Sequence, residues 1–280
     1  MKKLNFLLIL LNICLYTSIK AQNMEVIQLW QNGAPNENGL TGEETQLENG
    51  RIGNITKPAI TVYHPEKPNG IVIIMCPGGG YFRLAPNHEG FDMNKWFTSL
   101  GVTYAVLKYR MPNGHPEVPV SDAEQAIRIF RQHAAEWKIN PNRIGIMGAS
   151  AGGHLASTIS TQPSSKDVQP DFQILLYPVI SYLNSLHSSL LGENPSEELR
   201  IKYSSELQVT ENTAPAFIAV SSNDNLVLNC ISYYLTLIEN NVSATLHIYP
   251  TGGHGWGYND DFYYKREWTQ ELEKWLRTFQ

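Results

Sequence analysis

Short apolar runs recur along the chain and alternate with amphipathic segments. Several of these runs are apolar at every position, which is typical of parallel strands that helices cover on both faces. The predicted strands are 71–76, 103–109, 143–148, 172–177, 216–221 and 244–249. Because strands alternate with helical segments, the pattern predicts an α/β fold with a mostly parallel central sheet and helices on both faces.

The clearest helical pattern covers residues 121–137, where the apolar positions fall at helical spacing. Ser121 followed by Glu124 matches a capping box, so we expect the helix to begin there. A second helix is predicted at the C-terminal end, where one apolar stripe contains Trp268, Leu272, Trp275, Leu276 and Phe279.

One segment, residues 179–213, interrupts the alternation of strands and helices. It contains no convincing strand pattern and includes the polar stretch "GENPSEEL". Since it lies between two predicted strands, we expect a short helical insertion over the carboxyl edge of the sheet, where open α/β sheets bind ligands.

The first residues have the pattern of a secretory signal. Lys2 and Lys3 precede an apolar stretch over 4–16, and "SIKA" before Gln22 is a plausible cleavage site. The apolar stretch is short for a membrane span of about 20 residues, so no stable membrane anchor is expected. We therefore predict a signal peptide over 1–21, a single domain over 22–280, and a secreted or periplasmic protein.

Composition limits the classes of partner and the state of the cysteines that we expect. Apolar residues make up 42% and charged residues 17% of the 280, as in globular proteins. Removing residues 1–21 takes away three lysines and no acid, which changes the formal net charge from −5 to −8. This charge argues against binding to nucleic acid or anionic lipid. Cys76 and Cys230 are expected to be buried free thiols, and no cysteine spacing is typical of a metal site.

The stretch "MGASAGGH" places Ser150 in a G-x-S-x-G pattern between Gly148 and Gly152. It follows a predicted strand and precedes a small-residue helical segment, which is the setting of a nucleophile elbow. The flanking glycines permit the close approach of strand and helix at such a turn. We predict that Ser150 is a catalytic nucleophile.

A serine nucleophile needs a base and an acid. In folds that carry a nucleophile elbow, the acid follows the serine in the chain and the histidine comes last. His254 lies in the glycine-rich "PTGGHGWGY" after the last predicted strand, and is the predicted base. Asp224 follows the strand at 216–221 and is the predicted acid. An aspartate there could also cap the next helix, and the two roles are compatible.

The stretch "CPGGGYF" directly follows the strand at 71–76. Consecutive glycines allow backbone N–H groups to point toward a developing oxyanion, and each such donor contributes about 3 kcal/mol to the transition state. We predict an oxyanion hole made by the amides of Gly79, Gly80 and Ala151. The stretch lacks the spacing of dinucleotide and phosphate loops.

These motifs, taken together, resemble a known family. The chain resembles the secreted bacterial α/β-hydrolases of the feruloyl-esterase-like and acetylxylan-esterase group in "LWQNGAPN", "CPGGGYFRLAPNHEG", "YRMP", "SDAEQAIRIFR", "INPNRIGIMGASAGGHLAST", "YSSELQVTENTAPAF" and "GGHGWG". The resemblance implies the α/β-hydrolase fold and a serine carboxylic ester hydrolase that removes acetyl or feruloyl groups from plant polysaccharides such as xylan. It also implies that Ser150, Asp224 and His254 form the triad, with no metal or organic cofactor.

Substrate contacts are expected beside these motifs. Tyr81 and Trp256, together with their neighbours Phe82 and Tyr258, could stack on a sugar or aryl ring, or could belong to the core. The stretch "NHEG" places His88 and Glu89 either at the rim of the site or at the cap of a helix over 91–100. The predicted partner is an acylated oligosaccharide or polysaccharide.

Two other functions are compatible with parts of the pattern. A prolyl-oligopeptidase-like serine peptidase also uses a serine elbow, but the residues before the first core strand are too few for its propeller domain. A non-catalytic carbohydrate-binding hydrolase scaffold would not need the full set of catalytic residues. A glycosidase would need two facing carboxylates, which nothing in the sequence sets up.

Overall fold

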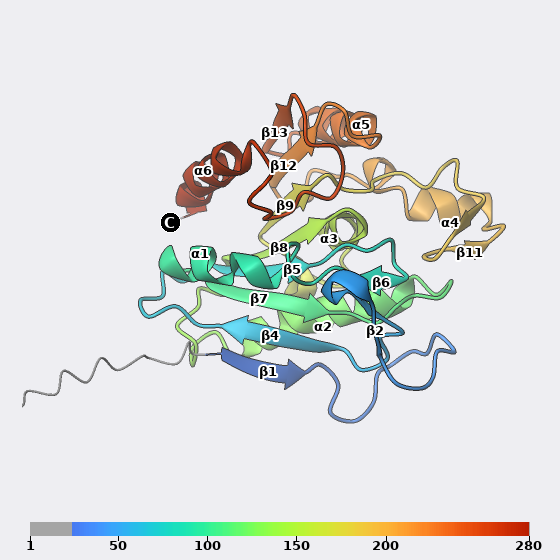
Figure 1. The fold of residues 1–280 in the computed structure, drawn as a ribbon, viewed down its shortest axis with the longest axis horizontal. Coiled ribbons are helices and arrows are strands. Elements are labelled where there is room, and N and C mark those ends of the chain that lie inside the picture. The colour runs from blue at the N-terminus through green and yellow to red at the C-terminus, as the bar shows by residue number, and fades with distance from the viewer. Residues whose placement is uncertain (1–23, 280) are drawn as a thin grey trace, which may run out of the picture.

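The computed structural model describes residues 24–279 and is built around one large twisted sheet (Figure 1). Strands β7, β5, β8, β9, β12 and β13 are parallel neighbours, while β4 pairs antiparallel with β7 and β1 pairs antiparallel with β4. In sheet order the strands are β1 (Met24–Gln28), β4 (Ala59–Tyr63), β7 (Thr103–Lys108), β5 (Val72–Cys76), β8 (Ile144–Ala149), β9 (Phe172–Leu176), β12 (Ala216–Ser221) and β13 (Ala244–Tyr249).

All six predicted strands are confirmed, with ends within one residue of those expected. The apolar runs were readable because β5, β8, β9 and β12 are buried along their whole length. The antiparallel strands β1 and β4 were not predicted. In β1, partly buried positions alternate with exposed ones, so this edge strand lacks a continuous apolar run.

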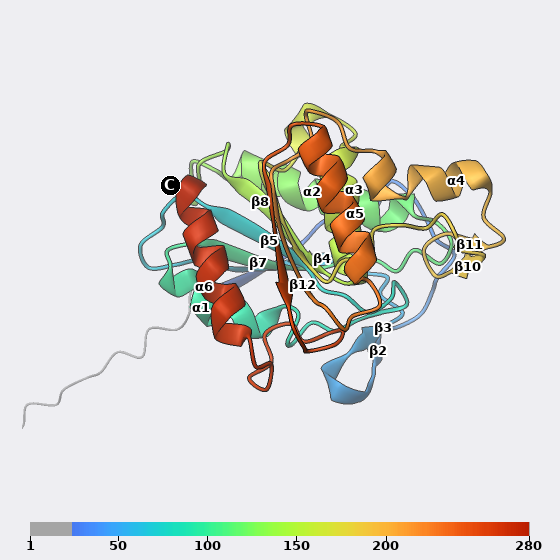
Figure 2. The same ribbon diagram turned by 90° about the horizontal axis from the view of Figure 1, so that it is seen from above.

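Helices cover both faces of the sheet, as predicted. Figure 2 shows α1 and α6 on one face and α2, α3 and α5 on the other. Their bounds are α1 (Asn94–Ser99), α2 (Glu117–Gln132), α3 (Ala151–Thr161), α5 (Val227–Glu239) and α6 (Lys265–Leu276).

The predicted start of α2 is wrong. The helix begins at Glu117, four residues before Ser121, and Pro119 occupies its first turn, where a missing N–H costs nothing. Ser121 is therefore inside the helix, and its hydroxyl donates to the carbonyl of Val118. The helix also ends at Gln132, short of the predicted 137.

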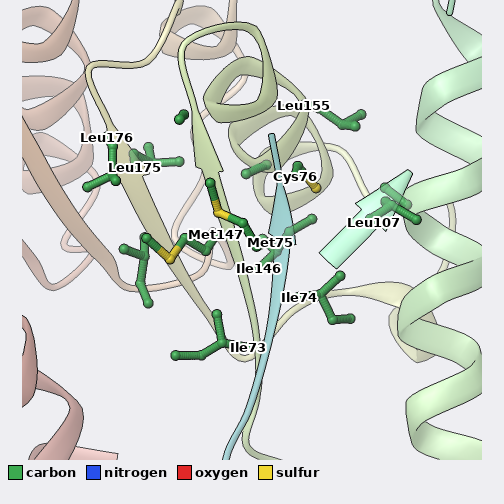
Figure 3. Packing of buried hydrophobic residues seen from close by; sticks show 14 of the residues in the cluster. Ile73, Ile74, Met75, Cys76, Leu107, Ile146, Met147, Leu155, Leu175 and Leu176 are labelled. Atoms are coloured by element: carbon green, nitrogen blue, oxygen red, sulfur yellow. The ribbon is translucent and has the colours of Figure 1, made fainter. Parts of the chain in front are cut away.

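Buried apolar side chains lie on both faces of the central strands (Figure 3). Met75 of β5, Met147 of β8 and Leu155 of α3 are all fully buried. Burying such side chains on both faces stabilises the central strands by about 25 cal/mol per Å² of apolar surface removed from water. The loops that follow these strands are thereby held in place at one edge of the sheet.

The insertion over 179–213 is only partly helical. It contains the helix α4 (Glu197–Lys202), the 3-10 turn η4 (Ser205–Leu207) and a small hairpin of β10 (His187–Ser188) and β11 (Gly192–Glu193). The smaller elements elsewhere are β2 (Thr45–Gln46), β3 (Ile52–Gly53), β6 (Arg83–Leu84), η1 (Glu48–Gly50), η2 (Phe91–Met93), η3 (Lys166–Val168) and η5 (Arg277–Phe279).

The predicted signal peptide over 1–21 lies outside the described residues. Between residues 24 and 279, no helix is long and apolar enough to cross a membrane. Cys76 and Cys230 are buried free thiols, as predicted.

Candidate active site

Ser150 occupies a sharp turn between β8 and α3. Its backbone angles are φ 52° and ψ −118°, a strained conformation for a residue with a side chain. A Cβ at Gly148 would collide with the carbonyl of Gly152, and a Cβ at Gly152 would collide with the carbonyl of Cys76. The two glycines of the motif are therefore required for strand and helix to meet at this angle.

The structure brings together the three residues predicted to form a triad. The Nε2 atom of His254 lies 2.8 Å from the Oγ of Ser150, and its Nδ1 lies 2.8 Å from Oδ2 of Asp224. Because a carboxylate only accepts hydrogen bonds, Nδ1 carries the proton and Nε2 is free to accept the serine hydroxyl. This tautomer allows the imidazole to act as a general base.

Asp224 combines both roles that the sequence left open. Its Oδ1 accepts the N–H of Leu226 just before α5 begins, while Oδ2 holds His254. The neighbouring Asn223 accepts the N–H of Gly253. The loop that carries Asp224 therefore holds both the side chain of His254 and the backbone of the loop that carries it, here called the histidine loop.

Residues 77–80, here called the oxyanion loop, follow β5. The N–H of Gly78 donates to Glu89, so it is already used. In contrast, within the part of the chain that the structure describes, the N–H groups of Gly79, Gly80 and Ala151 donate to no protein acceptor. These three groups are those predicted to form the oxyanion hole.

Glu89 lies in the interior, 3% exposed, and joins two loops of the site. Its Oε2 accepts the N–H of Gly78 at 2.9 Å, and its Oε1 accepts the hydroxyl of Tyr177 at 2.8 Å. The Tyr177 oxygen in turn accepts the N–H of Gly257 at 2.8 Å. Burial, and secondly the Glu89 carboxylate, raise the pKa of Tyr177, which keeps its hydroxyl protonated as a donor.

This connection was missed by the sequence analysis. Tyr177 also contacts the ring of His254 edge-on, with ring centroids 4.9 Å apart. Its φ of 36° is a signal that only the structure reveals. Glu89 was predicted at the rim or at a helix cap. Its burial contradicts the rim position, and its carboxylate binds Gly78 and Tyr177 instead of capping η2 or α1.

The other predicted substrate contacts differ in exposure. Trp256 is buried and stacks on Phe262, with ring centroids 4.2 Å apart, so it belongs to the core instead of the surface. Tyr258 packs on the ring of Trp96. His88 is half-buried, and its carbonyl accepts the N–H of Tyr258.

Tyr81 is buried beside the site, whereas Phe82 is exposed. The Tyr81 hydroxyl donates to Nδ1 of His154, whose Nε2 proton donates to the carbonyl of Tyr203. Burial lowers the pKa of His154 to about 4, so the ring is neutral at pH 7. His154 is therefore a buried residue with a structural role.

Two cavities border parts of the site. One, of about 420 Å³, is lined by Tyr81 and Phe82 at the end of the oxyanion loop and by the hairpin 187–193. The other, of about 310 Å³, is lined by His254 and Tyr263. The first cavity thus borders the residue that follows the oxyanion loop, and the second borders the candidate base.

The chain matches the BD-FAE family over residues 60–237. This protein belongs to the BD-FAE family. The matched region contains the oxyanion loop, Ser150 and Asp224, while His254 lies beyond it.

Two curated relatives carry names from xylan degradation. The chain is 39% identical to an acetylxylan esterase of Xylanibacter ruminicola, over 79% of this chain and 48% of that protein. It is 32% identical to endo-1,4-beta-xylanase B of Butyrivibrio fibrisolvens, over 68% of this chain and 33% of that protein. The BD-FAE chain described here thus spans about half the length of the first relative and a third of the second.

Solved structures share the fold. A crystal structure of an acetyl ester-xyloside bifunctional hydrolase from Caldicellulosiruptor lactoaceticus is 34% identical, with a TM-score of 0.75 over 91% of this chain and 96% of that one. An α/β hydrolase from a deep-sea metagenome library is 20% identical, with a TM-score of 0.68 over 92% and 97%. The predicted α/β-hydrolase fold is confirmed.

Proposed function

We propose that this BD-FAE family protein is a serine carboxylic ester hydrolase that removes acetyl groups from acetylated plant polysaccharides such as xylan. The observation that carries the proposal is the continuous hydrogen-bonded line from Ser150 through His254 to Asp224. The names of the acetylxylan esterase and of the acetyl ester-xyloside hydrolase support the acetyl group and the carbohydrate as substrate parts.

In the first half of the reaction, His254 Nε2 takes the proton of Ser150 while Oγ attacks the acetyl carbonyl carbon. The carbonyl oxygen becomes an oxyanion, which the amides of Gly79, Gly80 and Ala151 stabilise. When the bond from carbon to the sugar oxygen breaks, the imidazolium returns its proton to that oxygen. The sugar leaves as an alcohol, and the acetyl group remains on Ser150.

In the second half, water attacks the acetyl-enzyme. His254 takes a proton from the water, the oxyanion forms again in the same place, and the bond to Ser150 Oγ breaks. The proton returns to the serine and acetate leaves. Asp224 stays ionised throughout and stabilises the imidazolium.

The test compares acetate released from acetylated xylan with ferulate released from a feruloylated arabinoside. We expect acetate release by the unaltered protein and its loss in Ser150→Ala. Ferulate release without acetate release would contradict the proposed acyl group. Hydrolysis of a prolyl peptide without either release would contradict the proposed reaction class.

Export would place this activity at its substrate, because xylan lies outside the cell. The support is the sequence of residues 1–21, with its lysines, its apolar stretch and a plausible cleavage site after Ala21. Expression of the full chain in a bacterial host, followed by N-terminal sequencing of the exported protein, should give Gln22 as the first residue. Retention of Met1 in a cytoplasmic product would contradict export.

A further inference from the structure

A cavity of about 420 Å³ lies beside the oxyanion loop, within the size range of about 300–1,000 Å³ usual for small-ligand sites. Its walls come from the loops that follow β5, β7 and β9, at Phe82, Asn113 and the hairpin 187–193. These strands and β8 are parallel neighbours, so their ends meet at one edge of the sheet. Ser150 follows β8, and the cavity therefore opens at the edge that carries the serine.

One wall of the cavity presents an aromatic ring. Phe82 is 55% exposed, an unusually high fraction for a phenylalanine, and it lies two residues after Gly80 of the oxyanion loop. The guanidinium of Arg83 lies 4.7 Å from the centroid of this ring, which holds the ring from one side. A supported and exposed aromatic ring is a surface on which the apolar face of a sugar can stack.

Other residues that line the cavity carry polar groups that are not used by the protein. His187 of β10 and Glu193 of β11 face each other across the hairpin, and neither side chain has a hydrogen-bond or ion-pair partner among residues 24–279. Asn113 is fixed by donating its amide to the carbonyl of Asn38, which leaves its side-chain oxygen as an acceptor. Donors and acceptors thus line the same cavity as Phe82.

The hairpin is tied to the rest of the cavity. The N–H of Gly114 donates to the carbonyl of Ser189 at 3.0 Å, which joins the hairpin to the loop after β7. This contact holds the hairpin with His187 and Glu193 beside Asn113 and Gly114, which also line the cavity. The cavity is therefore largely formed in the protein as it stands, which lowers the entropic cost of binding.

We propose that this cavity is a carbohydrate subsite, which binds the neutral sugar units next to the acetylated one. Phe82 stacks on a sugar ring, while Asn113, His187 and Glu193 bind sugar hydroxyls. No lysine or arginine lines the cavity and Glu193 carries a negative charge, so neutral sugars are favoured over sugar acids. The polar wall argues against a fatty acyl chain as the occupant. The inference rests on the proposed esterase function and assigns its sugar-binding part.

The test compares two substrates that differ in whether they reach the cavity. Acetylated xylotetraose extends beyond Ser150, whereas 4-nitrophenyl acetate does not carry sugar units. We expect Phe82→Ala and His187→Ala each to lower the ratio of kcat/KM for the oligosaccharide to that for 4-nitrophenyl acetate by about threefold to tenfold, mainly through KM. A matched control is Leu235→Ala, which removes a side chain of similar exposure, 52%, from α5. Its ratio should equal that of the unaltered protein.

Direct binding gives an independent measurement. Xylotetraose without acetyl groups should bind the unaltered protein in calorimetry and bind Phe82→Ala more weakly by a similar factor. Unchanged ratios and unchanged binding in Phe82→Ala and His187→Ala would overturn the subsite while leaving the esterase proposal intact. If the unaltered protein cleaves 4-nitrophenyl acetate but neither cleaves nor binds the oligosaccharide, the carbohydrate part of the proposed function fails with it.

Discussion

Ser150 combines a strained backbone with a fully assembled proton path. The positive φ of this residue costs of order 1–3 kcal/mol. The packing of β8 against α3 holds the backbone in this conformation. The strain places Oγ within 2.8 Å of the imidazole of His254. Energy stored in packing is thus used to position the reacting atom before any substrate arrives.

Asp224→Asn tests the role of the acid. The amide can still accept the N–H of Leu226, but it cannot hold the proton on Nδ1 of His254, so the histidine adopts the wrong tautomer. We expect kcat on 4-nitrophenyl acetate to fall about 10⁴-fold with the fold retained by circular dichroism. Asp260→Asn, at an exposed aspartate in the loop before α6, is the control and should keep its kcat. A loss smaller than about tenfold in Asp224→Asn would contradict the triad.

At the scale of elements, the site is assembled from loops that follow different strands, and side chains hold these loops together. The oxyanion loop after β5 and the histidine loop after β13 are connected through Glu89 and Tyr177. Because both partners are buried, removal of one leaves an unpaired polar group in the interior. The spacing between the oxyanion donors and the base therefore depends on this pair.

Tyr177→Phe tests that dependence. It removes the hydroxyl that Glu89 accepts and leaves the N–H of Gly257 without its acceptor, so we expect kcat to fall about tenfold to hundredfold with a smaller change in KM. Steady-state kinetics on 4-nitrophenyl acetate measures the effect. Tyr249→Phe is the matched control, because the buried Tyr249 hydroxyl has no hydrogen-bond partner among the described residues. Equal kcat values for the two variants would refute a positioning role.

The elements that could be predicted from the sequence are those that leave a local pattern along the chain. Fully buried strands give continuous apolar runs, and the elbow, the acid and the base follow strand ends in an order that the pattern reveals. The start of α2 was misplaced, because Ser121 and Glu124 match a capping box although both lie inside the helix. The Glu89–Tyr177 contact joins residues 88 positions apart and leaves no local pattern.

At the scale of the whole molecule, buried polar groups make stability depend on pH and join segments that are distant in the sequence. His154 is enclosed between Tyr81 and Tyr203 on the helix that begins at the serine elbow. Asp122 of α2 is fully buried and binds Arg110 and the indole of Trp30, which ties the N-terminal segment to the sheet. Both groups lie outside the reaction itself, so they affect folding more than chemistry.

We predict that the folded protein loses stability in acid because of His154. Burial lowers its pKa from 6.5 in the unfolded chain to about 4 in the folded protein, so between these values the unfolded state binds more protons. The free energy of unfolding should therefore fall as the pH drops from about 6.5 to 4, by about 3 kcal/mol from this group. Urea denaturation at pH 7 and pH 4.5 measures the fall. His154→Gln, which does not titrate, should show a smaller fall, and an equal fall would contradict this assignment.

Asp122→Ala leaves the Arg110 guanidinium buried without its carboxylate. We expect the free energy of unfolding to decrease by about 3–5 kcal/mol. Asp167→Ala, which removes an exposed partner of Arg128, should have little effect. Equal effects of the two substitutions in urea denaturation would contradict the importance of the buried pair.

The central claim is that Ser150 is the activated nucleophile, and covalent labelling tests it most directly. A fluorophosphonate should add once to the protein, and peptide mapping should place the adduct on Ser150. Ser150→Ala should remain unlabelled, and His254→Ala should label much more slowly because no base removes the serine proton. An adduct on another residue, or no adduct on folded protein, would contradict the account.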